Sequence, residues 1–447
     1  MTSTSLLARA SALVFLGAPA LAAGQQTGSN RWGPQVLGTQ INVIAQRLAP
    51  FRSAYEGPNS LTSRGDRQLS DIYGLYLGQR VSGTLHAYLD IEMARGAGVS
   101  HATGLGGVTN GDVIRQGSGD LGEGPYVARA YLRWTIALPG ARRDTLGRAP
   151  DQMADVEPAH RLEIQGGKFA LSDIFDVNRY ANTTRLQFMD WGLFQNTAWD
   201  FAADTRGYSN GVALAWISRH ATLRLGSFQM PRAANGNIFD ADTRHARGDN
   251  VELTVLAPVT GTTVRLLAYE NHARMGSYAE AIAIARATAS VPNVVADDRP
   301  GRAKRGWGLN AEQPLADIGE TGLFARLGAS DGRNEDFAFT EVDRHASVGA
   351  QLSGVHWGRA ADRVALGAVR HDISTLHREY LAAGGKGFLL GDGALRYGSE
   401  DIVEGYYRVQ ANPFIEVTPD VQRVVNPGYN RDRGPATVVS LRINLRY

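Results

Sequence analysis

The strongest constraint on the fold is the alternation of apolar and polar side chains along short segments, and it is clearest at the end of the chain. In VVSLRINLRY, residues 438–447, one face carries Val439, Leu441, Ile443, Leu445 and Tyr447, and the other carries Ser440, Arg442, Asn444 and Arg446. Successive side chains of a β-strand point to opposite faces, so this strand needs an apolar environment on one side and water on the other. The same alternation recurs in residues 85–93, 128–136, 403–410 and 415–422.

Segments of about ten residues with one apolar and one polar face are typical of transmembrane β-barrels. The pattern predicts strands near residues 36–49, 69–80, 82–95, 125–138, 160–171, 207–218, 221–231, 249–258, 261–275, 301–313, 318–330, 343–355, 362–373, 400–411, 414–424 and 434–447. Long and short connections alternate between them, as expected when long loops lie outside and short turns lie in the periplasm. The connection 139–159 is longer than this rule predicts. We therefore expect an all-β fold, a transmembrane antiparallel β-barrel of about 16 strands, and not a secreted soluble all-β domain.

Composition excludes several partners and chemistries. The chain has 46 Lys plus Arg against 44 Asp plus Glu, so it lacks the basic field that attracts nucleic acid, and we expect no nucleic-acid partner. It has no cysteine, which excludes disulfides and thiolate metal ligands or nucleophiles. No shift in composition marks a domain boundary within the 447 residues, which favours one large domain.

The first residues have the pattern of an export signal. Arg9 precedes an apolar stretch over residues 10–18, and Ala20 and Ala22 provide small residues for cleavage. The apolar stretch is shorter than the roughly 20 residues of a membrane-spanning helix. We expect a signal peptide at residues 1–22, a single barrel domain at residues 23–447, and a location in the outer membrane with the lipid bilayer against the apolar strand faces.

Six segments in the second part of the chain stand out: 187–216 (QFMDWGLFQNTAWDFAADTRGYSNGVALAW), 228–236 (FQMPRAANG), 273–278 (ARMGSY), 322–344 (GLFARLGASDGRNEDFAFTEVDR), 380–398 (YLAAGGKGFLLGDGALRYG) and 425–435 (VNPGYNRDRGP). They resemble the carbohydrate-selective porin family, the OprB type, of Gram-negative outer membranes. The resemblance extends from about residue 160 to the end. It implies a sugar-conducting barrel with an inward-folded loop, an arginine-rich constriction and small sugars as permeating solutes. The terminal Tyr447 resembles the signal by which the outer-membrane assembly machinery recognises barrels, which implies that machinery as a partner.

The third long connection, residues 172–206, is the candidate constriction loop. It combines aromatic, charged and amide side chains: Arg185, Asp190, Trp191, Phe194, Asn196, Trp199, Asp204 and Arg206. A sugar offers apolar C–H faces and a rim of hydroxyls, so flat aromatics and hydrogen-bonding groups are suitable partners for it. The alternative is that Trp191 and Trp199 only pin the loop to the barrel wall.

Four arginines on polar strand faces are also expected to line the lumen: Arg129, Arg133, Arg408 and Arg442. The alternative for each arginine is a wall residue that is paired with a nearby carboxylate.

No sequence motif supports catalysis. GASDG at 328–332 and GYSNG at 207–211 have the spacing of a nucleophile elbow, but neither is predicted to join a strand to a helix, as that motif requires. GSGDLG at 117–122 matches a dinucleotide fingerprint only in its letters. We therefore predict no catalytic residue, no cofactor and no metal site, although calcium binding by the acidic stretch 240–249 stays open. Passive, sugar-selective diffusion is the favoured function, and the alternatives are a general small-solute porin and an outer-membrane barrel hydrolase.

Overall fold

The computed structural model describes residues 33–112, 121–140, 142–150 and 152–447. The expected signal peptide at residues 1–22 lies outside the described residues. Residues 35–447 form one unit, which is built almost entirely of β-strands. Among the described residues, no helix combines the length and the hydropathy that crossing a membrane would require.

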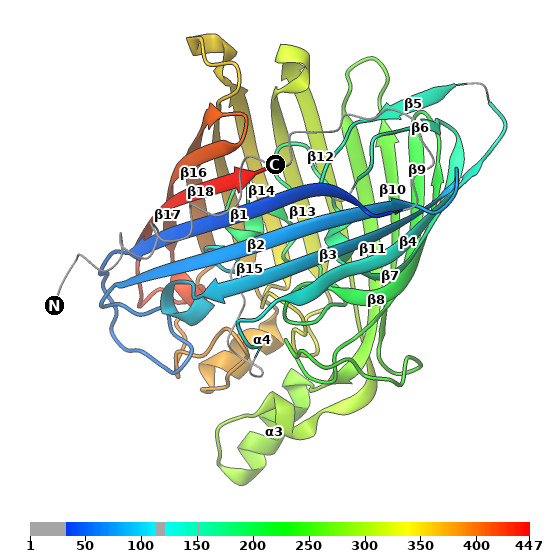
Figure 1. Cartoon of the computed structure of the whole chain (residues 1–447). Helices are drawn as coiled ribbons and strands as arrows, with labels where there is room; N and C mark the ends of the chain where they lie inside the picture. The colour runs from blue at the N-terminus through cyan, green and yellow to red at the C-terminus, as the bar shows by residue number, and fades with distance from the viewer. Residues whose placement is uncertain (1–32, 113–120, 141, 151) are drawn as a thin grey trace. The chain divides into compact units, whose positions relative to one another are not determined.

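Sixteen strands form a closed antiparallel barrel in which neighbouring strands follow one another along the chain (Figure 1). The barrel strands are β1 (Gln35–Leu48), β2 (Asp66–Arg80), β3 (Leu85–Gly96), β4 (Tyr126–Ala137), β7 (Arg161–Phe169), β8 (Ser209–Ile217), β9 (Ala221–Gln229), β10 (Arg247–Leu256), β11 (Thr263–Met275), β12 (Arg299–Ala316), β13 (Thr321–Ser330), β14 (Arg344–Ser353), β15 (Arg363–Asp372), β16 (Glu400–Asn412), β17 (Ile415–Val425) and β18 (Ala436–Arg446). Pairing of β1 with both β2 and β18 closes the ring. The prediction of a barrel of about 16 strands is confirmed, and each expected segment overlaps one barrel strand.

The side chains of β18 show why the alternating pattern forms a barrel wall. Val439, Leu441 and Ile443 point outward, and Val439 is 53% exposed. Arg442 and Asn444, on the other face, are buried inside the barrel. The two faces therefore meet the two environments that the sequence predicts, which are lipid outside and a polar interior.

Strand β4 departs from strict alternation at Ala128. In the β3–β4 ladder, Asp90 pairs with Arg129 while the next residue, Ile91, pairs with Val127, so Ala128 is the extra residue of a β-bulge. Ala128 was expected on the apolar outer face, but it is fully buried inside the barrel. The bulge is the physical reason for this difference, because one inserted residue reverses the sense of alternation.

The connections differ in length at the two ends of the barrel. The long ones, at the end where Figure 1 shows α3 (Tyr278–Thr288) and α4 (Thr375–Ala382), are 49–65, 97–125, 170–208, 230–246, 276–298, 331–343, 373–399 and 426–435. At the other end, most connections are tight turns of two to nine residues, such as 413–414 and 354–362. By the general rule for outer-membrane barrels, the long loops face the outside and the tight turns face the periplasm.

The connection 138–160 is the exception among the short turns because it forms a hairpin of its own, β5 (Arg143–Leu146) paired with β6 (Asp155–Pro158). Its Arg148 donates hydrogen bonds to the carbonyls of Leu37 and Val36 on β1, at 2.7 and 2.9 Å. The hairpin thus reaches from β4 to the first strand, and the extra residues of this connection serve that contact.

Candidate functional site

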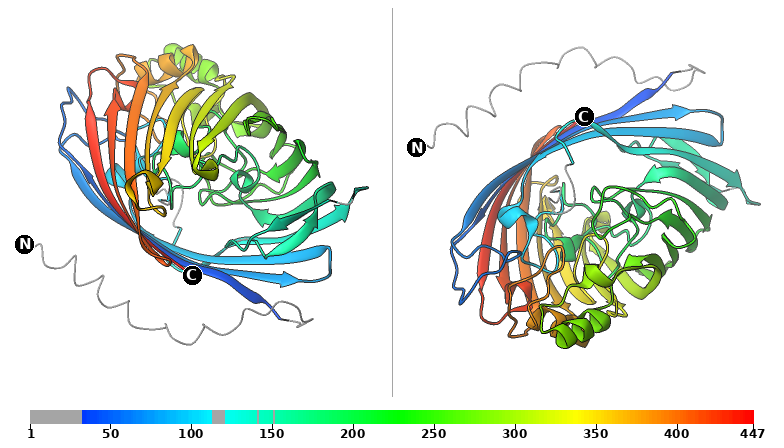
Figure 2. Two further views of the ribbon diagram at one scale, coloured as in Figure 1. Left: turned by 90° about the horizontal axis from the view of Figure 1, so that it is seen from above. Right: turned by 90° about the horizontal axis from the view of Figure 1, so that it is seen from below.

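The connection between β7 and β8, residues 170–208, folds into the barrel; we refer to it as the 170–208 loop. Both end-on views in Figure 2 show segments of this part of the chain inside the ring of strands. Glu404, an inward residue of β16, accepts hydrogen bonds from the backbone N–H groups of Met189 and Asp190, at 2.6 and 2.8 Å. Because strand side chains hold the backbone of the loop from inside the barrel, the loop is a fixed part of the lumen.

Arg326 on β13 is a central anchor of the 170–208 loop. Its side chain is fully buried and lies 3.1 Å from the carboxylate of Asp176. It also donates to the backbone carbonyls of Asp176, Ala181 and Leu193, at 3.1, 2.6 and 3.0 Å. One guanidinium therefore fastens three separate points of the loop, which a planar fork of five N–H donors allows.

Two of the arginines expected in the lumen have a similar anchoring role. Arg442 on β18 donates to the carbonyls of Thr184 and Gln187, and Arg408 on β16 donates to the carbonyl of Leu186 at 3.2 Å. Neither is among the residues that line the cavity beside the 170–208 loop, which is described next. The inner wall of β16–β18 thus uses arginine side chains to satisfy loop carbonyls, which would otherwise be buried without a partner.

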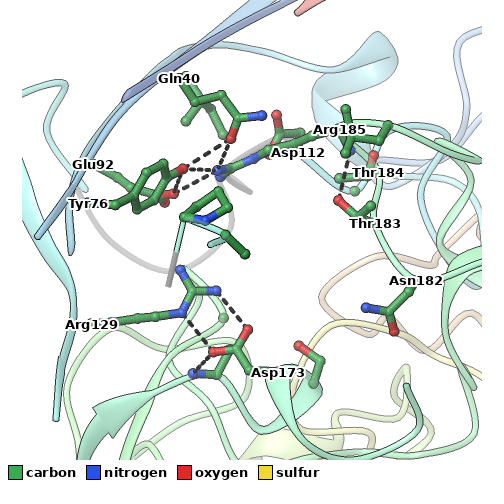
Figure 3. Close-up of a pocket in the computed structure, with 18 of the residues that line it drawn as sticks. Gln40, Tyr76, Glu92, Asp112, Arg129, Asp173, Asn182, Thr183, Thr184 and Arg185 are labelled. Carbon is green, nitrogen blue, oxygen red and sulfur yellow. Dashed lines mark hydrogen bonds and ion pairs between the residues drawn. The ribbon is translucent and has the colours of Figure 1, made fainter. Parts of the chain in front are cut away.

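A cavity of about 690 Å³ lies beside the 170–208 loop (Figure 3). Residues of five strands contribute polar groups to its wall: Gln40 of β1, Tyr76 of β2, Glu92 of β3, Arg129 of β4 and Arg446 of β18. Five connections complete the wall, with Asp112 from 97–125, Phe339 from 331–343, residues 148–150 from the 138–160 hairpin, residues 413–414 from the turn between β16 and β17, and a larger set from the 170–208 loop. The cavity is therefore a joint product of the barrel wall and the loops folded into it.

Arg185 is a highly connected side chain of this cavity (Figure 3). Its guanidinium donates to four acceptors, Glu92 at 2.8 Å, Asp112 at 2.9 Å, Tyr76 at 2.9 Å and Gln40 at 3.1 Å. Burial opposes the charged form of Arg185, but the carboxylates of Asp112 and Glu92 outweigh it and raise its pKa well above the ordinary value. The cavity thus holds a permanent cation that is matched by two carboxylates.

A second polar cluster adjoins the Arg185 cluster, because Glu92 also accepts a hydrogen bond from Tyr126 at 3.2 Å. Arg129 binds both carboxylate oxygens of Asp173 at 2.7 Å and reaches Asp90 at 3.2 Å. Arg206 lies over the ring of Tyr126, with its guanidinium carbon 3.9 Å from the ring centroid. The bulge at Ala128 makes this cluster possible, because it allows both Tyr126 and Arg129 to face the interior.

Aromatic side chains form the apolar part of the cavity wall. Trp191 stacks on Phe339 with ring centroids 5.0 Å apart and also contacts Phe194 at 5.2 Å. Trp191 begins the short helix α2 (Trp191–Phe194), and the side chain of Asp190 caps that helix by accepting the N–H of Gly192 at 2.9 Å. The helix cap therefore sets the direction in which the Trp191 and Phe194 rings enter the lumen.

The structure places the residues singled out from the sequence in two groups. Five of them line the cavity: Arg129, Arg185, Trp191, Phe194 and Arg206. The others are outside its lining: Arg133, Asp190, Asn196, Trp199, Asp204, Arg408 and Arg442. Trp199 contacts the barrel wall: its ring is buried, and its ring N–H donates to Asn250 on β10 at 2.9 Å. These contacts correspond to the alternative in which a tryptophan pins the loop to the wall.

The remaining residues outside the lining also hold local structure. Arg133 pairs with Glu157 at 2.6 Å, and Asn196 donates its backbone N–H to Asp176 at 2.9 Å. Asp204 accepts the backbone N–H groups of Arg206 and Tyr208 and so closes a turn.

Burial affects the ionisation of two of these loop carboxyls. Burial raises the pKa of Asp190 well above the ordinary value, and the negative charges of Glu404 and Glu400 add to this effect. Burial also raises the pKa of Asp204, against the opposing effect of Lys168. Both carboxyls therefore favour the neutral form more than an exposed aspartate does.

Several lining residues were not singled out as site residues from the sequence: Gln40, Tyr76, Glu92, Asp112, Tyr126, Asp173, Tyr208 and Phe339. Glu92 had a usable signal, since it lies on the polar face of a predicted strand. Asp112 and Phe339 had none, because they lie in loops whose approach to the 170–208 loop depends on the closed barrel.

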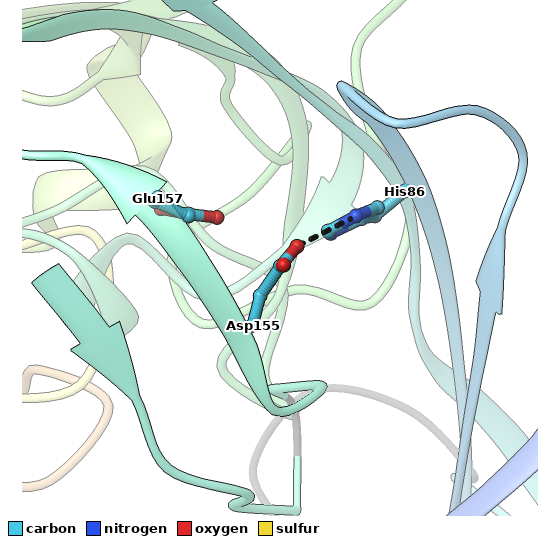
Figure 4. A group of neighbouring side chains, drawn as sticks. All are labelled: His86, Asp155 and Glu157. Carbon is cyan, nitrogen blue, oxygen red and sulfur yellow. Dashed lines mark ion pairs between the residues drawn. The ribbon is translucent and has the colours of Figure 1, made fainter. Parts of the chain in front are cut away.

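Two clusters of histidine and carboxylate side chains lie elsewhere in the described residues. One is His86, Asp155 and Glu157 (Figure 4), and the other is Asp336, Asp343 and His377. Neighbouring cations already match these carboxylates: Arg80 lies 3.0 Å from Asp155, Arg133 lies 2.6 Å from Glu157, and Lys304 bonds to Asp336. The first cluster therefore clamps the 138–160 hairpin to β3 and β4, and the second clamps the 331–343 loop to α4.

The sequence and the fold are both similar to those of known outer-membrane porins. The model of the carbohydrate-selective porin family, OprB, matches residues 78–447. A high-pH structure of OprB from Pseudomonas putida aligns with a TM-score of 0.67 and 15% identity, covering 92% of this chain and 94% of that one. The outer membrane channel DcaP of Acinetobacter baumannii aligns with a TM-score of 0.51 and 8% identity, covering 93% and 98%. At these identities the two structures show a shared fold. No curated protein matches the sequence.

Proposed function

Because the chain belongs to the OprB family of carbohydrate-selective porins, and is therefore a sugar-selective porin of the outer membrane, we propose that sugars cross it by passive diffusion through the cavity beside Arg185. The 170–208 loop then forms the constriction. The observation that carries the proposal is the division of this cavity into an aromatic wall around Trp191 and a polar wall around Arg185.

The two walls suit the two kinds of surface that a sugar presents. An aromatic ring packs against the apolar C–H face of a pyranose, while arginine, carboxylate and tyrosine groups bond to the hydroxyl rim. Transport also requires that each contact be weak enough to release the solute. At Arg129 and Arg185 the charged groups already bond to one another, so a sugar hydroxyl there exchanges with existing hydrogen bonds.

Within this proposal, the permeating sugar contacts Arg129, Arg185, Trp191 and Arg206. The other residues predicted from the sequence, Arg133, Asp190, Asn196, Trp199, Asp204, Arg408 and Arg442, position the loop or the wall. A general small-solute porin is the alternative, and it requires no aromatic wall.

Replacing Trp191 by alanine tests this proposal. We expect saturable sugar binding to weaken by about 1–3 kcal/mol, the scale of one lost aromatic stacking contact, and ion conductance to rise because a large side chain leaves the lumen. Single-channel recording with sugar titration measures both effects. Trp307→Ala is the matched control, since Trp307 is on the outer face of β12. Unchanged sugar binding in the Trp191 variant, with amino acids and sugars of equal size passing equally well, would support the general porin.

The proposal includes three further parts. We propose that residues 1–22 are removed on export, that residues 23–447 form the mature single-domain barrel, and that the assembly machinery recognises the last strand through Tyr447. We also propose that the protein catalyses no reaction, because its family consists of porins and no motif supports a nucleophile. Lipase and protease assays on the purified barrel test this last part against the hydrolase alternative.

A further inference from the structure

Three arginines on the outer face of the barrel lie near the long-loop ends of their strands. They are Arg47 at the end of β1, Arg67 at the start of β2 and Arg423 near the end of β17, and all three are exposed. Their strands are near neighbours, in the order β17, β18, β1 and β2 (Figure 1). Among the described residues, no carboxylate forms an ion pair with any of the three, and Arg423 donates only to the hydroxyl of Thr437, at 2.6 Å.

Arg47 and Arg67 are directly opposite each other in the β1–β2 ladder. Like charges in directly opposed positions destabilise a sheet. Arg423 pairs in register with Thr437, which is two residues from the β18 partner of Arg47. Two strand spacings and one two-residue step separate Arg423 from Arg47 by about 12 Å. The three cations therefore lie close together on one surface and form no ion pair among the described residues; we call it the β17–β2 basic surface.

Outward arginines on five other strands have a carboxylate partner at the same end of the barrel. The pairs are Arg95–Asp71, Arg247–Asp249, Arg274–Asp298, Arg305–Glu270 and Arg370–Asp401, all within 3.2 Å. These five arginines have partners at the rim, and Arg344 of β14 lies opposite Asp372 in the β14–β15 ladder. Among the described residues, the β17–β2 basic surface has no such carboxylate partner.

We propose that the β17–β2 basic surface binds the phosphate groups of a phosphorylated lipid in the membrane leaflet that the long loops face. The residues next to these arginines on the outer strand faces are apolar and exposed, such as Leu69, Val421 and Val439, so acyl chains pack directly beneath the cations. A guanidinium fork matches phosphate oxygens, and the anion removes the repulsion between Arg47 and Arg67. This inference does not depend on the sugar path, because the surface faces away from the lumen.

Lipid binding by purified protein in neutral detergent tests the proposal. The probes are lipid A with both phosphates, the same glycolipid with the phosphates removed, and inorganic phosphate, and native mass spectrometry measures their binding. The test variant replaces Arg47, Arg67 and Arg423 by serine. Its matched control replaces three paired arginines, Arg95, Arg305 and Arg370, by serine and so removes the same charge. Arg67→Ser alone serves as the mildest variant, and heat-modifiable migration in gels verifies the barrel in every sample.

We expect the phosphorylated glycolipid to bind more tightly than its dephosphorylated form, and to lose roughly fivefold in affinity for each arginine removed from the surface. The control, in which three paired arginines are replaced, should keep most of its affinity for the phosphorylated glycolipid. Equal binding by the wild type and by folded Arg67→Ser and triple variants would overturn the proposal. Equal affinity for the dephosphorylated glycolipid would also overturn it, and binding of inorganic phosphate as tightly as the glycolipid would indicate a free-anion site instead.

Discussion

Replacing Arg326 by methionine is expected to destabilise the folded barrel by about 3–5 kcal/mol, the typical cost of removing one partner from a buried ion pair. The carboxylate of Asp176 would remain buried without its cation, and the carbonyls of Ala181 and Leu193 would lose their donor. The 170–208 loop should then detach from β13. Equilibrium unfolding in denaturant measures the loss of stability, and increased current noise in single channels reports the mobile loop.

Two further variants make the Arg326 result specific. Arg326→Met combined with Asp176→Asn should recover part of the lost stability, because the neutral amide no longer needs a cation. Arg370→Met is the surface control: Arg370 pairs with Asp401 at 2.6 Å but its side chain is 60% exposed, so its loss should cost no more than about 1 kcal/mol. Equal stability of all three variants would show that Arg326 does not hold the loop.

Replacing Arg185 by glutamine should have the largest effect on selectivity. Glu92, whose side chain is 1% exposed, and Asp112 would keep their negative charges without the cation between them. In a narrow, poorly screened lumen this change should shift ion preference strongly toward cations and weaken sugar binding. Reversal potentials in a salt gradient measure the first effect, and sugar block of single-channel current measures the second.

The double variant Arg185→Gln with Glu92→Gln separates charge from direct contact. It removes one positive and one negative charge, so ion preference should return toward that of the wild type. Sugar binding should stay weak, because the donor fork of Arg185 is still missing. Full recovery of sugar binding in the double variant would mean that Arg185 acts only through its charge, and would contradict the proposed contact.

The barrel could be predicted from the sequence because each wall residue faces either lipid or the polar interior. The alternation of apolar and polar residues along a strand shows which side each residue faces. Leu89 and Glu92 sit on opposite faces of β3, as the alternation predicts. The bulge at Ala128 leaves a much weaker signal, which is the interruption of the alternation by the adjacent apolar residues Val127 and Ala128. The register with β3 is needed to identify the extra residue. The length of the 138–160 connection likewise could not be predicted, because its reason is the contact of the hairpin with β1, which forms only in the closed barrel.

The residues of the candidate site could be predicted only in part. Trp191 and Trp199 lie eight positions apart in one loop and look equivalent in the sequence. Their surroundings differ because Asn250, on a strand 51 residues further along, accepts the ring N–H of Trp199, while the Trp191 ring reaches the cavity. Arg185 was recognisable as a candidate, but its partner Glu92 is 93 residues away and comes within reach only when the barrel closes.

One measurement tests most directly whether the permeating sugar passes the 170–208 loop. The chain has no cysteine, so Ser172→Cys introduces a single thiol into the cavity wall, and Ser290→Cys introduces one on the exposed long loop 276–298. Each variant is reconstituted in liposomes, modified with a bulky thiol reagent, and tested for sugar flux. The account predicts that modification at Ser172 blocks most of the flux and that modification at Ser290 leaves it unchanged. Full sugar flux after complete modification at Ser172 would contradict the account.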